Sequence, residues 1–184
     1  MTRSLEGLEM NLANFLSEKR SSLVKKWSNL LIETYPDDAQ RFLKKERDQF
    51  ANPVGHVITK EIGALFDELL KDGDTNRIYS CLQNIVRIRA VQDFKPSQAI
   101  AFVLQLKKLI REDLKEGSMG GDLSGELESL EDRIDQMALL AFDIHSECRE
   151  KIYELRVKEV KNQVSRLLER SDLICEMPGQ DSGS

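Results

Sequence analysis

The sequence predicts an all-α protein, with a bundle of about five to seven helices followed by one long C-terminal helix. Nearly every apolar segment repeats at steps of three or four residues, which is the spacing of one face of a helix. Alternating runs of β-branched residues, the pattern typical of strands, do not occur. Neither proline nor glycine interrupts the periodicity between Gly125 and Pro178, which favours a single long helix there.

We expect three segments along the chain. Residues 1–116 are predicted to form an N-terminal helical bundle, residues 122–176 a long helix that packs on the bundle and projects from it, and residues 177–184 a disordered tail. The stretch Gly117-Ser118-Met119-Gly120-Gly121 is the clearest internal linker, because clustered glycines interrupt helices. The tail is polar and contains glycine, as disordered termini commonly do.

Prolines and capping residues place the helix boundaries inside the bundle. Pro36 ends one helix, since proline disfavours helical backbone at the residue before it. A short helical piece is expected from Asp38 to Phe50. Asn52-Pro53 then opens a new helix, with asparagine as the N-cap and proline at the first helical position. Phe94-Lys95-Pro96 breaks the chain once more.

The single tryptophan, Trp27, is predicted to anchor the core of this bundle. It shares one helical stripe with Leu23, Leu30 and Leu31. Core residues of amphipathic helices usually have this arrangement. We therefore interpret Trp27 as a packing residue and not as a binding-site aromatic.

Composition excludes several classes of function. The chain has 184 residues, a net charge of −5 and no apolar run that approaches the roughly 20 residues needed to cross a bilayer. We therefore expect neither nucleic-acid binding nor membrane insertion, and a cytoplasmic location, because the first residues lack the apolar core of a signal peptide. The three cysteines are widely spaced and form no CxxC pair, which indicates neither a disulfide framework nor a zinc site.

The long C-terminal pattern predicts a homodimer. Its apolar stripe continues from Leu123 to Leu167, further than a bundle of ordinary size can cover. The far half would leave one apolar patch in water unless a second copy covered it. The candidate interface consists of Ile152, Leu155, Val160, Val164 and Leu167. The alternative is a break near His145 that folds the helix back as an antiparallel hairpin within one chain.

Linear motifs of catalysis are absent from the sequence. It contains no GxSxG elbow, no phosphate-binding glycine loop and no HxxxH pair. We therefore expect no catalytic residue, no metal site and no enzyme activity. The two histidines, His56 and His145, are the weak candidates for holding a cofactor such as haem, which needs an axial ligand.

Several stretches of the chain carry a family resemblance. They are Leu23-Val24-Lys25-Lys26-Trp27, Asn52-Pro53-Val54-Gly55, Ile88-Arg89-Ala90-Val91-Gln92-Asp93-Phe94 with the following Lys95-Pro96-Ser97-Gln98-Ala99, and Phe102-Val103-Leu104-Gln105-Leu106-Lys107-Lys108-Leu109-Ile110-Arg111. With these motifs the sequence resembles the N-terminal domain of RsbRD, a stressosome protein described as an RsbT co-antagonist. The motifs are structural in character and not catalytic.

The resemblance implies a sensor-type helical bundle related in fold to the non-haem globin-like domains of stressosome proteins. Such domains form dimers, and their last helix leads into a C-terminal STAS domain. No strand–helix–strand pattern of a STAS domain follows the long helix here, so we expect this sequence to lack one. A scaffold or an RsbT-like kinase, which the STAS domain would bind, is then not the expected partner.

Three functions compete at this stage. The first is a non-enzymatic regulatory or adaptor protein that acts as a homodimer through contact with an unidentified protein partner, with no cofactor. The second is a globin-like sensor that binds haem or another small ligand. The third is a structural coiled-coil adaptor, in which the N-terminal bundle only anchors the long helix.

Overall fold

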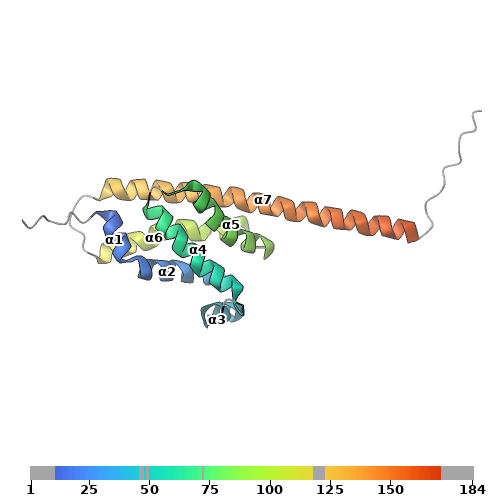
Figure 1. Cartoon of the computed structure of the whole chain (residues 1–184), viewed down its shortest axis with the longest axis horizontal. Coiled ribbons are helices and arrows are strands. Elements are labelled where there is room, and N and C mark those ends of the chain that lie inside the picture. The colour runs from blue at the N-terminus through green and yellow to red at the C-terminus, as the bar shows by residue number, and fades with distance from the viewer. Residues whose placement is uncertain (1–10, 46–47, 49, 72, 118–122, 171–184) are drawn as a thin grey trace, which may run out of the picture. The chain divides into compact units, whose positions relative to one another are not determined.

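The computed structural model describes residues 11–45, 48, 50–71, 73–117 and 123–170. Within these ranges the chain forms helices and turns and no strand, so the all-α prediction is confirmed, as is the long C-terminal helix (Figure 1). The helices are α1 (Leu12–Glu18), α2 (Arg20–Ile32), α3 (Asp37–Lys45), α4 (Pro53–Leu70), α5 (Thr75–Val91), α6 (Pro96–Glu116) and α7 (Ser124–Arg170).

The residues Asn52 to Gly55 cap and begin α4. The side chain of Asn52 accepts a hydrogen bond from the backbone N–H of Gly55 at 2.8 Å, and Pro53 occupies the first turn, as predicted. The Asn52 amide also donates to the carbonyl of Leu43 in α3 at 3.1 Å. A Cβ at position 55 would collide with this capping side chain. Glycine is therefore needed here for close approach.

The connection between α5 and α6 turns on a left-handed residue. Asp93 has φ of 59°, and no other non-glycine residue among those described has a positive φ. Pro96 begins α6 two residues after Phe94, as the sequence predicts. Phe94 consequently lies in a short loop between two helices and belongs to neither.

The core of the bundle is built around α2. Trp27 of α2 is fully buried, and its indole N–H donates to the carbonyl of Phe102 in α6 at 2.7 Å. The two rings lie 6.2 Å apart between centroids. The prediction that Trp27 anchors the core is confirmed. Around it, α2 packs against α4 and α6, and α4 packs against α5 (Figure 1).

The first half of α7 completes this core. Its buried apolar residues are Leu130, Ile134, Met137, Ala138, Ala141 and Ile144. Charged pairs hold the helix against α6: Arg111 donates to Glu131 through Nε and Nη2 at 2.5 and 2.6 Å, and Lys107 lies 2.7 Å from Asp135. No break occurs at His145, so α7 is not folded back into the hairpin that the sequence left open.

The chain divides into two compact units, Met1–Cys148 and Arg149–Ser184. The first unit contains the bundle. The described part of the second unit is the last stretch of α7, from Arg149 to Arg170. The expected disordered tail at residues 177–184 lies outside the described residues.

Candidate functional site

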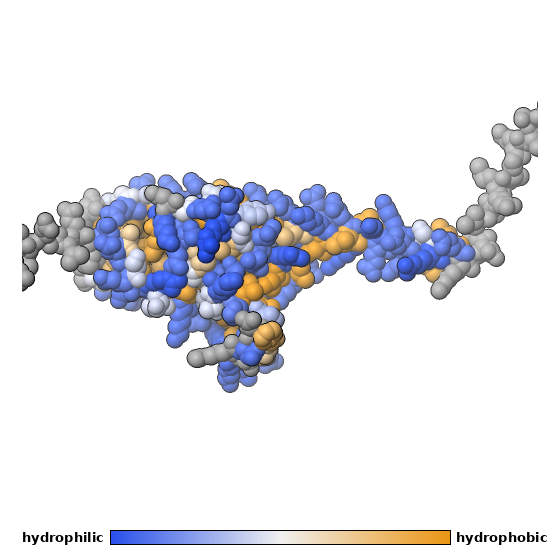
Figure 2. Space-filling view, in the orientation of Figure 1, coloured by the Kyte–Doolittle hydropathy of each residue, from blue (hydrophilic) through white to orange (hydrophobic). Residues whose placement is uncertain are grey.

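The second unit exposes apolar side chains along its helix. Figure 2 shows hydrophobic residues among hydrophilic ones on the face of this helix that is in view. The exposed large apolar residues of the unit are Tyr153, Leu155, Val157, Val160, Val164, Leu167 and Leu168. Ile152 is half-buried. An apolar surface of this kind commonly marks an interaction site.

Five of these residues form one continuous stripe. Tyr153, Val157, Val160, Val164 and Leu167 follow one another at steps of four, three, four and three residues. This is the heptad spacing of a coiled-coil seam, in which Val157 and Val164 occupy a positions and the other three occupy d positions. We call these five residues the C-terminal seam.

The C-terminal seam overlaps the interface predicted from the sequence without matching it. Val160, Val164 and Leu167 belong to both sets. At about 100° per residue, Leu155 lies nearly opposite the middle of the seam, and Ile152 lies to one side of it. The interface predicted from the sequence does not include Tyr153 and Val157, because it continues the bundle-facing stripe of α7 straight along the helix. The signal that finds them is the restart of a four–three spacing at Tyr153.

The two histidines lie in different environments. His56 is exposed on the first turn of α4, and His145 is buried, with 1% of its surface accessible, on α7. No group of three or more histidine, cysteine, aspartate or glutamate residues in the described ranges could hold a metal ion. Neither histidine lines any cleft described below, so the structure adds no observation in favour of a haem site.

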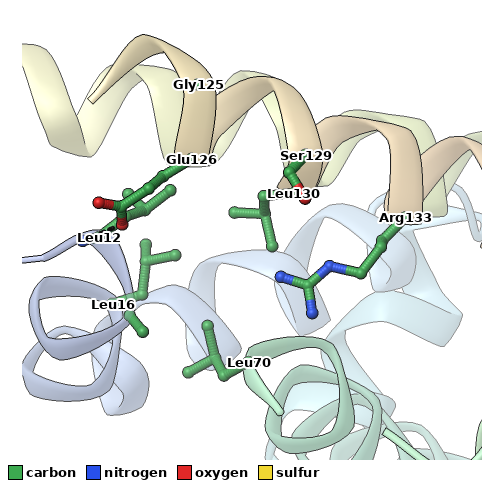
Figure 3. Close-up of a pocket in the computed structure, with 9 residues that line it drawn as sticks. Leu12, Leu16, Leu70, Gly125, Glu126, Ser129, Leu130 and Arg133 are labelled. Carbon is green, nitrogen blue, oxygen red and sulfur yellow. Dashed lines mark hydrogen bonds between the residues drawn. The ribbon is translucent and has the colours of Figure 1, made fainter. Parts of the chain in front are cut away.

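One cleft of the first unit opens where α1, the end of α4 and the start of α7 meet (Figure 3). Its apolar wall is formed by Leu12, Leu16, Leu70 and Leu130. At one side, the Glu126 carboxylate accepts the backbone N–H of Leu12 at 2.9 Å. The polar group at this rim is therefore already used to hold α1 against α7.

Arg133 lies at the other side of this cleft (Figure 3). Its Nη1 donates to the carbonyl of Lys71, just after α4, at 3.1 Å. The same side chain borders a second cleft of about 480 Å³ between the α4–α5 turn and α7, where Met137 and Leu140 are apolar lining residues. Arg133 thus separates two clefts and closes the end of α4 against α7.

The fold and surface describe an all-helical domain that continues into a long helix with an exposed apolar seam. The chain belongs to the RsbT co-antagonist protein RsbRD N-terminal domain family, whose model matches residues 21–160. The resemblance noted from the sequence is thereby confirmed. No curated protein and no solved structure matches the chain significantly.

The matched region includes every motif that carried the resemblance. The motif at Trp27 lies in α2, the one at Asn52 begins α4, the one ending at Phe94 closes α5, and the one from Phe102 to Arg111 lies in α6. The family is one of regulatory sensor domains and not a known enzyme family. Among the helices described, none has both the length and the apolar character needed to cross a bilayer.

Proposed function

We propose that this protein is a non-enzymatic regulatory domain that acts by protein–protein contact, and that it works as a homodimer paired through the C-terminal seam. The observation that carries the proposal is the four–three–four–three spacing of exposed apolar residues from Tyr153 to Leu167. A two-fold axis lets the same seam cover itself in two copies.

The residue types in the seam favour a parallel pair. β-Branched residues at a positions support two-stranded parallel coiled coils, and both a positions here, Val157 and Val164, are valines. In such a pair Arg149 at a g position would face Glu154 of the other chain, which is attractive. Arg156 would face Lys161, which is repulsive.

These features predict weak and reversible pairing. The seam covers little more than two heptads, so only a few apolar layers are available to hold two copies together. One favourable and one unfavourable flanking pair contribute little net stability. A dimer that forms and separates readily suits a regulatory role, because a modest change in the bundle can then shift the equilibrium.

Site-specific cross-linking tests the pairing and its direction. In a parallel, in-register dimer the two copies of Val164 face each other, so Val164→Cys should form a disulfide-linked dimer under mild oxidation. The matched control is Leu155→Cys, which lies on the other face and is more accessible, since Leu155 is 67% exposed and Val164 49%. Both variants should be made with Cys175 replaced by serine. If both variants form the disulfide-linked dimer equally, the seam is excluded as the interface. It is also excluded if neither variant forms the linked dimer although the chain is dimeric.

The structural-adaptor alternative uses the same seam but gives the bundle no role of its own. Light scattering on the full chain and on a version that ends near Glu150 locates the association. Loss of the dimer on truncation supports the seam, and a truncated form that stays dimeric would move the interface into the bundle. The family takes its description from a co-antagonist of RsbT, which is a regulatory protein. We therefore propose that the partner of this chain is also a regulatory protein.

A further inference from the structure

A buried arginine in the bundle lacks an anionic partner. Arg89 of α5 is fully buried, and its Nη2 donates to the carbonyl of Gln98 in α6 at 2.9 Å. Its Nε and Nη1 are inaccessible and have no hydrogen-bond partner among the described residues. Burial lowers the pKa of the guanidinium, and the nearby Tyr35 opposes that change. A buried cation without a carboxylate carries a desolvation cost that no ion pair offsets.

Aromatic rings compensate for only part of this cost. The Arg89 Cζ lies 4.0 Å from the centroid of the Phe94 ring and 5.6 Å from that of Tyr35. Cation–π contacts of this kind are weaker than a buried ion pair with a carboxylate. The Tyr35 hydroxyl is also buried, and it acts on the pKa of Arg89 both electrostatically and as a side-chain hydrogen-bond partner. The hydroxyl and the guanidinium therefore form one small cluster, in which a neutral phenol takes the place that a carboxylate has in an ion pair.

The cluster lies directly beneath a surface cleft. Gln98 accepts the hydrogen bond of Arg89, Tyr35 and Phe94 make its cation–π contacts, and all three residues line a cleft of about 460 Å³. Phe94 is half-buried and lies in the loop between α5 and α6. Its ring packs edge-on against Tyr35, with 5.2 Å between the ring centroids.

We propose that this cleft binds a small organic carboxylate, whose carboxylate group reaches Arg89 when the Phe94 ring turns aside and accepts hydrogen bonds from Nε and Nη1 in the plane of the guanidinium. A single negative charge balances the single buried cation. A phosphate dianion fits less well, because Asp93 also lines the cleft and would repel the second charge. The cleft volume suits a compact ligand, and the rings of Tyr35 and Phe94 favour one with an apolar or aromatic body.

Binding at this point would connect the ligand to the packing of the bundle. Arg89 is joined to the first turn of α6 through Gln98, and Tyr35 follows the end of α2. A carboxylate on Arg89 therefore touches the ends of α2, α5 and α6 together. The inference goes beyond the proposed dimer and does not depend on it, since the cleft lies wholly within the first unit.

The side-chain Nε–H resonance of Arg89 in the full-length protein is the direct readout. We expect sodium benzoate to shift this resonance to saturation and to raise the midpoint of thermal unfolding. Benzamide, which has the same shape and no charge, should do neither. The Nε–H groups of Arg20 and Arg111, already paired with Asp67 and Glu131, are internal controls and should stay in place.

Arg89→Met keeps the length of the side chain and removes its charge. It should weaken benzoate binding by roughly 10- to 100-fold, as expected for the loss of charge-assisted hydrogen bonds. An equal thermal response of wild type and Arg89→Met would overturn the proposal. An equal response to benzamide would do the same. If Arg89→Met does not fold, the wild-type resonance decides alone: no shift with benzoate or acetate up to about 50 mM, where even millimolar binders occupy their sites, refutes the inference.

Discussion

Replacing Val160 with aspartate should dissociate the proposed homodimer. Val160 occupies the central d position of the C-terminal seam and is 57% exposed in the single chain. Full burial of a valine stabilises by about 1.5 kcal/mol at the low end, so covering the exposed part is worth about 0.9 kcal/mol per chain and about 1.7 kcal/mol per dimer. Since 1.4 kcal/mol corresponds to a factor of ten, losing this burial weakens the dimer about 20-fold.

The introduced carboxylates increase the effect beyond that figure. Two of them would meet in one layer of the seam, where each is partly removed from water and repelled by the other. We therefore expect the dimer dissociation constant, measured by sedimentation over a dilution series, to rise by more than the burial alone predicts.

Leu155→Asp is the matched control for this experiment. Leu155 is 67% exposed and lies on the same helix, so its replacement introduces the same charge. It also costs more helix propensity than the change at Val160, because leucine is the better helix former, so an effect caused by weakening the helix would be larger in this control. It lies away from the seam and should leave the dissociation constant close to that of wild type. If Val160→Asp and Leu155→Asp have equal dissociation constants, the assignment of the seam is refuted, whether or not that constant differs from the wild-type value.

Three further predictions concern the bundle. Trp27→Ala should lower the free energy of unfolding by about 3 to 5 kcal/mol in urea denaturation, because the ring is fully buried; an unchanged midpoint would contradict the packing. Gly55→Ala should cost about 1 to 2 kcal/mol by displacing the Asn52 cap, and a thermal midpoint equal to that of wild type would show that the cap tolerates a Cβ. Hydrogen bonding from Arg20 is the main cause that lowers the pKa of Asp67, so the pair stabilises the fold above the ordinary pKa of about 3.9 and loses its effect as the pH falls further. The difference in stability between wild type and Asp67→Asn should be small near neutral pH, because both partners are about 40% exposed. This difference should be constant there and should shrink below about pH 4. A difference that grows on acidification would contradict this.

Local sequence signals were sufficient for most of the helix boundaries. The Asn52-Pro53 start of α4, the Pro96 start of α6 and the Gly117 end of α6 were each predicted from residue types whose backbone preferences act within a few residues. The piece expected from Asp38 to Phe50 is shorter in the structure and ends at Lys45 as α3. One contributing cause is a competing local bond, which sequence periodicity does not reveal.

That competing bond is made by Asp48. Its carboxylate accepts the backbone N–H groups of Phe50 and Ala51 at 2.7 and 3.1 Å, which turns the chain before Asn52. Aspartate side chains commonly divert backbone donors from helices in this way. An aspartate on the polar face of a predicted helix looks the same in sequence whether it does this or faces solvent.

The seam and the buried arginine needed the three-dimensional structure for a different reason. The spacing from Tyr153 to Leu167 was present in the sequence, but only the exposed fractions separate it from the bundle-facing stripe that precedes it on α7. In the sequence of α5, Arg89 follows the apolar residues Ile85 and Val86 and looks like an arginine that faces solvent at the border of the apolar face. Its complete burial depends on how α5, α6 and the end of α2 meet, and no pattern along one helix encodes that.

The burial of Trp27 also gives the protein a convenient optical property. It is the only tryptophan in the chain, and its indole lies in an apolar core with the N–H bonded to a backbone carbonyl. Its fluorescence emission should be blue-shifted in the folded bundle and should move to longer wavelength only when that core opens. Because the C-terminal seam contains no tryptophan, dissociation of a dimer through the seam should leave this emission unchanged. Tryptophan emission should therefore report unfolding of the bundle alone, without a contribution from self-association through the seam.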